Sequence, residues 1–231
     1  MSATPTSSVP PVVTIDGPSG AGKGTAAAAI AKRLGFHILD SGAVYRVAAL
    51  HALRKMADLT DEQSVLATFA DMRVSYEPKG LDGVAVTLND EDVTLNIRTE
   101  RAGNVASQIA VMPRVRESLL DEQRAFRQSP GLVADGRDMG TVVFPDASLK
   151  IFLTASPEKR AGRRAKQLKD KGITANIADL AREISERDNR DASREHSPLV
   201  PASDAVSIDS SGLSADEVEE RIVKEWLARI Q

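Results

Sequence analysis

The chain contains 231 residues, enough for one mid-sized globular domain with an insertion, and it contains no cysteine. The absence of cysteine excludes disulfide frameworks, thiolate zinc sites, iron–sulfur clusters and cysteine nucleophiles. Hydrophobic residues make up 42% and charged residues 27%, as in an ordinary globular protein, whereas aromatic residues make up only 3%. Because 33 Asp and Glu outnumber 30 Lys and Arg, no global basic field exists to hold a nucleic acid, and any phosphate binding must be local.

The first eleven residues differ in composition from the remainder. Residues 1–11 are rich in Ser, Thr and Pro and lack the basic start and apolar stretch of a signal peptide. No apolar run in the chain reaches the roughly 18 residues of a membrane helix. We therefore expect a flexible tail, 1–11, and one domain, 12–231, in a cytoplasmic, monomeric protein that binds neither membranes nor nucleic acid.

The first part of the domain predicts alternating strands and helices. The β-branched run Val12–Ile15 predicts a buried strand, which leads through a glycine-rich loop into a helix over 26–34. Residues 36–39 predict a second strand, and Asp40-Ser41-Gly42 predicts the cap of a second helix. Thr60–Gln63 matches a capping box for a third helix. This order of elements predicts a parallel sheet covered by helices.

The pattern then changes to a period of two. Hydrophobic residues alternate with polar ones between 73 and 97, which predicts a small inserted antiparallel sheet whose last strand is Val93–Ile97. A helical segment over 98–128 is broken at Pro113. Further strands are predicted at 132–134, 150–153 and 205–208, and further helices after Ser156-Pro157, over 177–190 and after the capping box Ser214–Glu217.

The loop after the first strand has the spacing of a phosphate-binding P-loop. Gly17-x-x-x-x-Gly22-Lys23 lies between a predicted strand and helix, so backbone N–H groups and the positive helix end point at one anion. Gly24 stands where a Ser or Thr usually follows the lysine, which leaves direct and water-mediated Mg²⁺ binding both open. The predicted ATP-binding residues are Gly17, Pro18, Ser19, Gly20, Ala21, Gly22, Lys23, Gly24 and Thr25.

Many arginines lie at predicted strand ends, on nearby helices or in a predicted lid, 156–175. They are Arg46, Arg116, Arg137, Arg160, Arg163, Arg164, Arg187, Arg190 and Arg194. Transfer between two phosphorylated molecules crowds negative charges together, so these guanidinium groups favour a phosphorylated acceptor. Arg160, Arg163 and Arg164 share a helix face and could close over ATP. The alternative for each arginine is a solvated face or surface ion pair, and for the group from Arg187 to Arg194 an ion-pair ladder along one helix.

Six stretches occur in a specific order between residues 12 and about 209. They are IDGPSGAGKGT (15–25), LDSGAVYR (39–46), ASQ (106–108), PRVR (113–116), ADGRDMGT (134–141) and ERDNRD (186–191). Together they resemble the bacterial cytidylate kinases. The resemblance implies an α/β P-loop NTPase fold, with a parallel sheet flanked by helices and a small antiparallel insertion, 73–97, inside a monophosphate-binding part, 42–112. It also implies γ-phosphoryl transfer from ATP to CMP or dCMP with Mg²⁺.

The same resemblance implies a role for each matching residue. Ser41, Arg46, Arg137 and Arg194 would hold the acceptor phosphate; Ser107, Arg116 and Asp138 would read cytosine; Arg187 and Asp191 would hold the sugar. The catalytic set would be Lys23, Asp135, Arg137, Arg160 and Arg164, with Mg²⁺ held mainly by phosphates and water and with Thr25 or Asp135 as protein ligands.

Several alternatives remain at this stage. Asp138 could pair with its neighbour Arg137, and Asp135 could cap the following turn. A uridylate or adenylate kinase is the alternative within the class. A nucleotide-dependent switch that hydrolyses ATP slowly is the alternative from another class, although no Asn-Lys-x-Asp guanine reader occurs in the chain.

Overall fold

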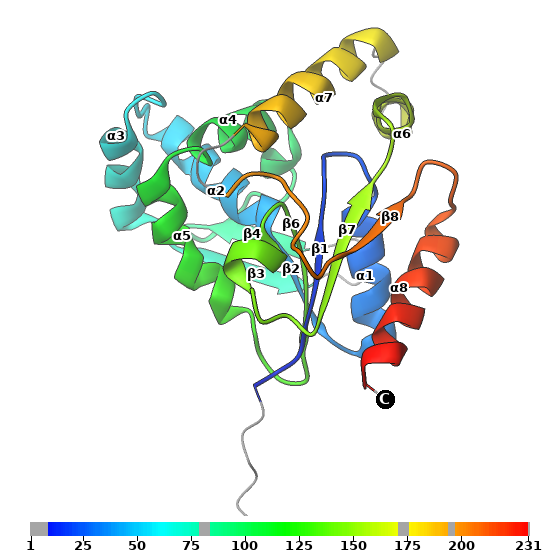
Figure 1. Cartoon of the computed structure of the whole chain (residues 1–231). Helices are drawn as coiled ribbons and strands as arrows, with labels where there is room; N and C mark the ends of the chain where they lie inside the picture. The colour runs from blue at the N-terminus through cyan, green and yellow to red at the C-terminus, as the bar shows by residue number, and fades with distance from the viewer. Residues whose placement is uncertain (1–8, 79–83, 171–175, 194–196, 231) are drawn as a thin grey trace, which may run out of the picture.

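The structure, a computed structural model, describes residues 9–78, 84–170, 176–193 and 197–230. Its centre is a five-stranded sheet of order β2-β6-β1-β7-β8 (Figure 1). All four strand pairs are parallel, which confirms the predicted parallel sheet. The strands are β1 (Val12–Asp16), β2 (His37–Asp40), β6 (Leu132–Gly136), β7 (Leu149–Thr154) and β8 (Val206–Asp209).

Helices cover both faces of this sheet (Figure 1). One face packs against α1 (Lys23–Leu34) and α8 (Ala215–Ile230) and the other against α2 (Ser41–Arg54), α4 (Glu100–Ile109) and α5 (Pro113–Ala125). Successive side chains of β1 point to opposite faces of the sheet. Val13 packs in the core with α1 and α8, and Val12 packs in the core with α2, α4 and α5. On the first face Trp226 of α8 is buried and stands edge-on to Phe36.

The remaining helices are α3 (Glu62–Ala67), α6 (Pro157–Asp170) and α7 (Ile177–Ala192). Helices α6 and α7 pack against each other beyond the ends of the sheet strands (Figure 1). A π-helical turn, Met139–Val143, follows β6. Among the described residues, no helix combines the length and apolarity needed to cross a bilayer.

The insertion is a separate antiparallel sheet of order β3-β4-β5. It comprises β3 (Val74–Pro78), β4 (Val84–Leu88) and β5 (Glu91–Asp92). Asn89 and Asp90 both have positive φ, as a two-residue hairpin turn requires. The antiparallel insertion is thus confirmed.

The predicted strand Val93–Ile97 is wrong. The Ile97 N–H instead donates to the Val93 carbonyl at 3.0 Å, and a 3₁₀ turn, Asn96–Arg98, follows. Val93 and Ile97 are both buried. Their spacing of four residues fits one helical turn as well as it fits a strand, so periodicity over five residues could not separate the two.

Most predicted helix boundaries are confirmed by their capping contacts. The Asp40 carboxylate accepts from the Ala43 N–H at 3.0 Å, and Pro113 begins α5. The Ser214 and Glu217 side chains each accept from the other's backbone N–H, as a capping box requires. The capping box at Thr60 is wrong by one residue, because Asp61 accepts the N–H groups of Gln63 and Ser64.

Candidate active site at the carboxyl edge of the sheet

The register between β1 and β6 places the candidate residues at one edge of the sheet. Ile15 lies opposite Asp135, and Asp16 lies opposite Gly136. The glycine loop that follows β1 and the segment Asp135–Asp138 that follows β6 therefore begin side by side. This is the position at which open α/β sheets bind ligands.

The glycine loop depends on a close approach to β7. Gly17 has φ 149°, and a Cβ there would lie 2.0 Å from the Leu153 carbonyl oxygen, so only glycine fits. Gly22 caps α1, and the first turn of α1 contains no acidic residue. The first turn of α1 therefore adds no negative charge of its own at the positive helix end, which favours anion binding there.

Two arginines of α6 bind the backbone of this loop. Arg160 donates to the Ser19 carbonyl at 3.1 Å, and Arg163 donates to the Ala21 carbonyl at 3.1 Å. Arg164 points elsewhere and forms an ion pair with Glu100 of α4. The three arginines therefore do not converge on one point in this structure, although two of them contact the ATP-binding candidate.

Lys23 and Asp135 form a buried pair beside the loop. The Lys23 ammonium lies 3.6 Å from the Asp135 carboxylate and donates to the Pro18 carbonyl at 3.2 Å. Burial lowers the pKa of Lys23 to about 8, and Arg137 adds to this effect, whereas Asp135 opposes it. Burial raises the pKa of Asp135, and the charge of Lys23 opposes that shift. A phosphate bound here would stabilise the charged form of the lysine.

Asp138 forms an ion pair with Arg116 of α5. The Asp138 side chain is buried, and Arg116 also donates to the Ala110 carbonyl at 3.2 Å and lies over the Tyr45 ring, 5.7 Å from its centroid. The alternative that Asp138 pairs with Arg137 is therefore wrong. Arg116 and Asp138 together offer donors and an acceptor in one place.

Arg137 and Ser107 meet at Asp191. The Arg137 Nε donates to one Asp191 oxygen at 2.9 Å, and the Ser107 hydroxyl lies 3.4 Å from the other. Although burial opposes it, the pKa of Arg137 is raised, chiefly because of the charge of Asp191. Asp191 is only 1% exposed, and these partners lie outside its own helix. An ion-pair ladder confined to α7 therefore does not describe this residue.

Arg46 and Arg187 approach each other at Gly103. A Cβ on Gly103 would lie 3.3 Å from Arg46 Nη2 and 3.8 Å from Arg187 Nη1. Arg46 also donates to the Ile97 carbonyl at 3.2 Å, and burial lowers its pKa. Ser41 is buried at the start of α2, and its hydroxyl would be 2.7 Å from a Cβ on Gly136. Several acceptor-side candidates thus gather between α2, α4 and β6.

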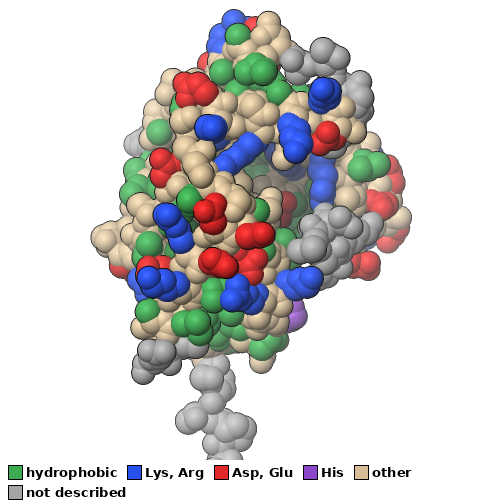
Figure 2. Space-filling model, turned by 90° about the vertical axis from the view of Figure 1, so that its right-hand side faces the viewer, with side chains coloured by type: hydrophobic (Ala, Val, Ile, Leu, Met, Phe, Trp, Pro, Cys, Tyr) green, Lys and Arg blue, Asp and Glu red, His purple; other side chains and the backbone are tan. Residues whose placement is uncertain are grey.

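Two parts of the sequence-based site lie outside the described residues. They are Arg194 and the end of the predicted lid, 171–175. On the face shown in Figure 2, several Lys and Arg side chains surround a hollow in the surface.

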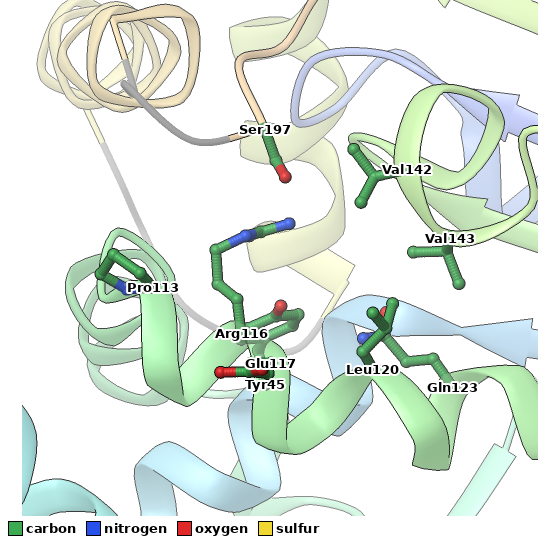
Figure 3. A pocket seen from close by; sticks show the side chains of 9 residues that line it. All are labelled: Tyr45, Pro113, Arg116, Glu117, Leu120, Gln123, Val142, Val143 and Ser197. Atoms are coloured by element: carbon green, nitrogen blue, oxygen red, sulfur yellow. The ribbon is translucent and has the colours of Figure 1, made fainter.

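A pocket of about 260 Å³ adjoins Arg116 (Figure 3). Its lining contains no residue of the glycine loop, so it is not the place where two phosphorylated substrates could meet. It is lined by Tyr45, Pro113, Arg116, Glu117, Leu120, Gln123, Val142, Val143 and Ser197.

Comparison with known proteins decides the family. The family model described as cytidylate kinase matches residues 13–227. The chain belongs to the cytidylate kinase family. It is 56% identical to the cytidylate kinase of Proteus mirabilis over 91% of this chain and 93% of that one. It is 57% identical to that of Serratia proteamaculans (91% and 92%) and 55% identical to that of Bordetella bronchiseptica (94% and 96%).

The solved structures that match are more distant. One from Thermus thermophilus is 19% identical and aligns with a TM-score of 0.46 over 97% of this chain and 100% of that chain. No conclusion about function rests on it.

ATP-dependent phosphotransfer generally uses Mg²⁺, an ion that prefers oxygen ligands. Within the described residues, no group of three or more Asp, Glu or His side chains could hold a metal ion by itself. Asp135 lies 3.3 Å from the Cβ position of Gly24, the residue that precedes the exposed Thr25. One carboxylate and one hydroxyl suit an ion that keeps its waters and arrives with nucleotide phosphates.

Sequence reasoning missed three carboxylates of the site. Asp188 of α7 lies 2.5 Å from Arg160, and Glu100 pairs with Arg164. Asp16 accepts the N–H groups of Met139 and Gly140, each at 2.8 Å. The signal for Asp16 was available, because a carboxylate at the end of a wholly buried strand needs partners inside the protein.

Because of Asp16, we predict that the free energy of unfolding depends on pH. Burial raises its pKa from 3.8 to about 7, and the nearby Asp138 charge adds to the shift, whereas the two backbone hydrogen bonds and Lys23 oppose it. Between these pH values the folded chain retains a proton that the unfolded chain has released. The unfolding free energy of the wild type minus that of Asp16→Asn should therefore fall as the pH rises through this window.

Urea unfolding of the two ligand-free proteins at several pH values measures this difference. A difference that stayed flat or rose from pH 4 to pH 7 would contradict the raised pKa.

Proposed function

We propose that this chain transfers the γ-phosphoryl group of ATP to CMP or dCMP, giving ADP and CDP or dCDP. The observation that carries the proposal is the Arg116–Asp138 ion pair, in which Asp138 follows the strand paired with β1, in a chain of the cytidylate kinase family. The roles given below to individual residues are part of this proposal.

The Arg116–Asp138 pair is complementary to the edge of cytosine. Cytosine offers its N4 amine as a donor and N3 and O2 as acceptors, which suit a carboxylate and a guanidinium respectively. Uracil would place its O4 acceptor against the Asp138 carboxylate, a mispairing that costs several kcal/mol where water is excluded. Ser107 would add a hydroxyl at this edge, and Asp191 and Arg187 would hold the sugar.

The acceptor phosphate would bind between Arg46 and Arg137, with Ser41 nearby and Arg194 as a further candidate. Arg137 is already held by Asp191, so its guanidinium is oriented before the substrate arrives. Fixed guanidinium groups bind phosphate oxygens through two parallel hydrogen bonds. This arrangement neutralises charge without proton transfer.

Phosphoryl transfer needs alignment and charge neutralisation more than acid–base chemistry. A phosphate monoester, with a second pKa of about 6, is already mostly dianionic at pH 7, so no general base is required. Lys23 and the N–H groups of α1 would hold the ATP phosphates, and Arg160 and Arg164 would neutralise charge as the lid, 156–175, closes and excludes water. Mg²⁺, when bound with the nucleotide, supplies further neutralisation beside Asp135 and Thr25.

A panel of monophosphates tests the proposal. In a coupled assay we expect ADP release with CMP and dCMP. With UMP and AMP we expect much weaker release. Efficient turnover of UMP or AMP would indicate another monophosphate kinase. ADP release at background with every monophosphate would favour a nucleotide-dependent switch.

Lys23→Ala is expected to lower kcat by about 100-fold or more, because a buried charge that contacts the transferred phosphoryl group is lost. CMP affinity without ATP should change little, since the acceptor candidates come from other segments. Calorimetric titration with CMP supplies the second measurement. Loss of CMP binding in that titration would contradict two separate pockets.

Asp138→Asn is expected to reduce the preference for CMP over UMP by at least about 10-fold, because the amide can turn a donor toward uracil O4. The ratio of kcat/KM values for the two substrates measures this preference. An unchanged ratio would remove Asp138 from the base-recognition site.

Gly103→Ala should strengthen the helix and weaken CMP binding at once. Alanine in a helix interior is favoured over glycine by about 1 kcal/mol, but here its Cβ would press on Arg46. We expect CMP affinity without ATP to fall several-fold, as measured by calorimetry.

Gly162→Ala is the matched control for this change. Gly162 lies in α6, and a Cβ there would have no neighbour within 4 Å. It should stabilise its helix and leave CMP affinity unchanged. Equal affinities in the two variants would show that the space at Gly103 does not position Arg46.

A further inference from the structure

Asp16 connects the two halves of the site. It is the last residue of β1 and directly precedes Gly17 of the glycine loop. Its side chain is only 5% exposed, and both oxygens are used: one accepts from the Met139 N–H and the other from the Gly140 N–H, each at 2.8 Å. The carboxylate therefore joins the start of the ATP-binding segment to the turn after β6.

The turn that Asp16 holds begins at Asp138. The Asp138 carbonyl accepts from the N–H groups of Val142 and Val143 at 2.9 and 3.2 Å, and its carboxylate pairs with Arg116. Asp16 fixes the two N–H groups that follow it. A five-residue turn of π geometry, of the kind found frequently at functional sites, is thereby held from both directions.

The chemistry of this contact requires a carboxylate. Two converging N–H donors need two acceptor oxygens, and an ionised carboxylate, which Asp16 carries above its pKa of about 7, offers both on one short group. An amide would turn its NH₂ group toward one of the donors. At this depth in the protein, water is not available to compensate the unpaired groups.

We propose that Asp16 is the positioning residue for base recognition: it sets where Asp138 stands relative to the ATP phosphates. The inference rests on the proposed transfer to CMP and adds a residue that touches neither substrate. Asp16 acts through the backbone of Met139 and Gly140.

Asp16→Asn tests the inference against Thr14→Val. Thr14 is also buried in β1, and its hydroxyl would be 2.8 Å from a Cβ on Gly140; within the described residues this hydroxyl has no hydrogen-bond partner. Thr14→Val therefore changes the same strand beside the same turn without removing a hydrogen bond. The readouts are KM for ATP, KM for CMP and the ratio of kcat/KM for CMP to that for UMP.

Asp16→Asn should lower the CMP-to-UMP ratio by about 10-fold or more and raise KM for CMP, the loss expected for a buried charge-assisted hydrogen bond. KM for ATP should stay within about twofold, because the glycine loop retains its contacts with Arg160 and Arg163. Thr14→Val should leave the ratio unchanged.

Asp16→Ser is a second variant for the case that Asp16→Asn does not fold, because its hydroxyl leaves one acceptor and introduces no amide donor. The ratio of kcat/KM for CMP to that for UMP must also fall in this variant. An equal loss of turnover with CMP and UMP at an unchanged ratio, in either variant, would overturn the inference. Wild-type protein without CMP-dependent ADP release would instead overturn the proposed function.

Discussion

The parallel pairing of β1 with β6 is the constraint on which the site depends. Val12 pairs with Leu132 and Asp16 with Gly136, so both strands end at the same level. The glycine loop leaves one strand and Asp135–Asp138 leaves the other. A slip of one residue would turn every side chain of one strand to the opposite face of the sheet. The buried cores on both faces therefore fix the register, and the register places the start of the glycine loop beside the segment Asp135–Asp138.

Charged side chains in this site are paired with one another. Arg116 contacts Asp138, Arg137 contacts Asp191, and Lys23 lies beside Asp135. Buried ion pairs of this kind add little net stability, because desolvation offsets much of their attraction. Under the proposed function their value lies in orientation, because each guanidinium or ammonium group would have a fixed direction when a substrate binds.

The fold, and the gathering of most candidate site residues at one edge of the sheet, could be predicted because they follow from local patterns and from where parallel strands end. The contacts between elements could not. Asp16 and Met139 are 123 residues apart, and Arg137 and Asp191 are 54 apart, so nothing local in the sequence indicates which carboxylate meets which partner. Val93–Ile97 was mistaken for a strand because five residues carry too little periodicity. Asp138 pairs with Arg116 and not with its neighbour Arg137, and this too depends on how α5 packs.

Helix α7 carries two carboxylates that form ion pairs with arginines of other elements. Asp188 contacts Arg160, which binds the glycine loop, and Asp191 contacts Arg137 on the acceptor side. They are three residues apart, nearly one turn of the helix. A single residue inserted between them would rotate Asp191 by about 100° and carry it away from Arg137. A change of length inside this interval would therefore separate the two contacts, so the spacing of Asp188 and Asp191 couples the glycine loop to Arg137.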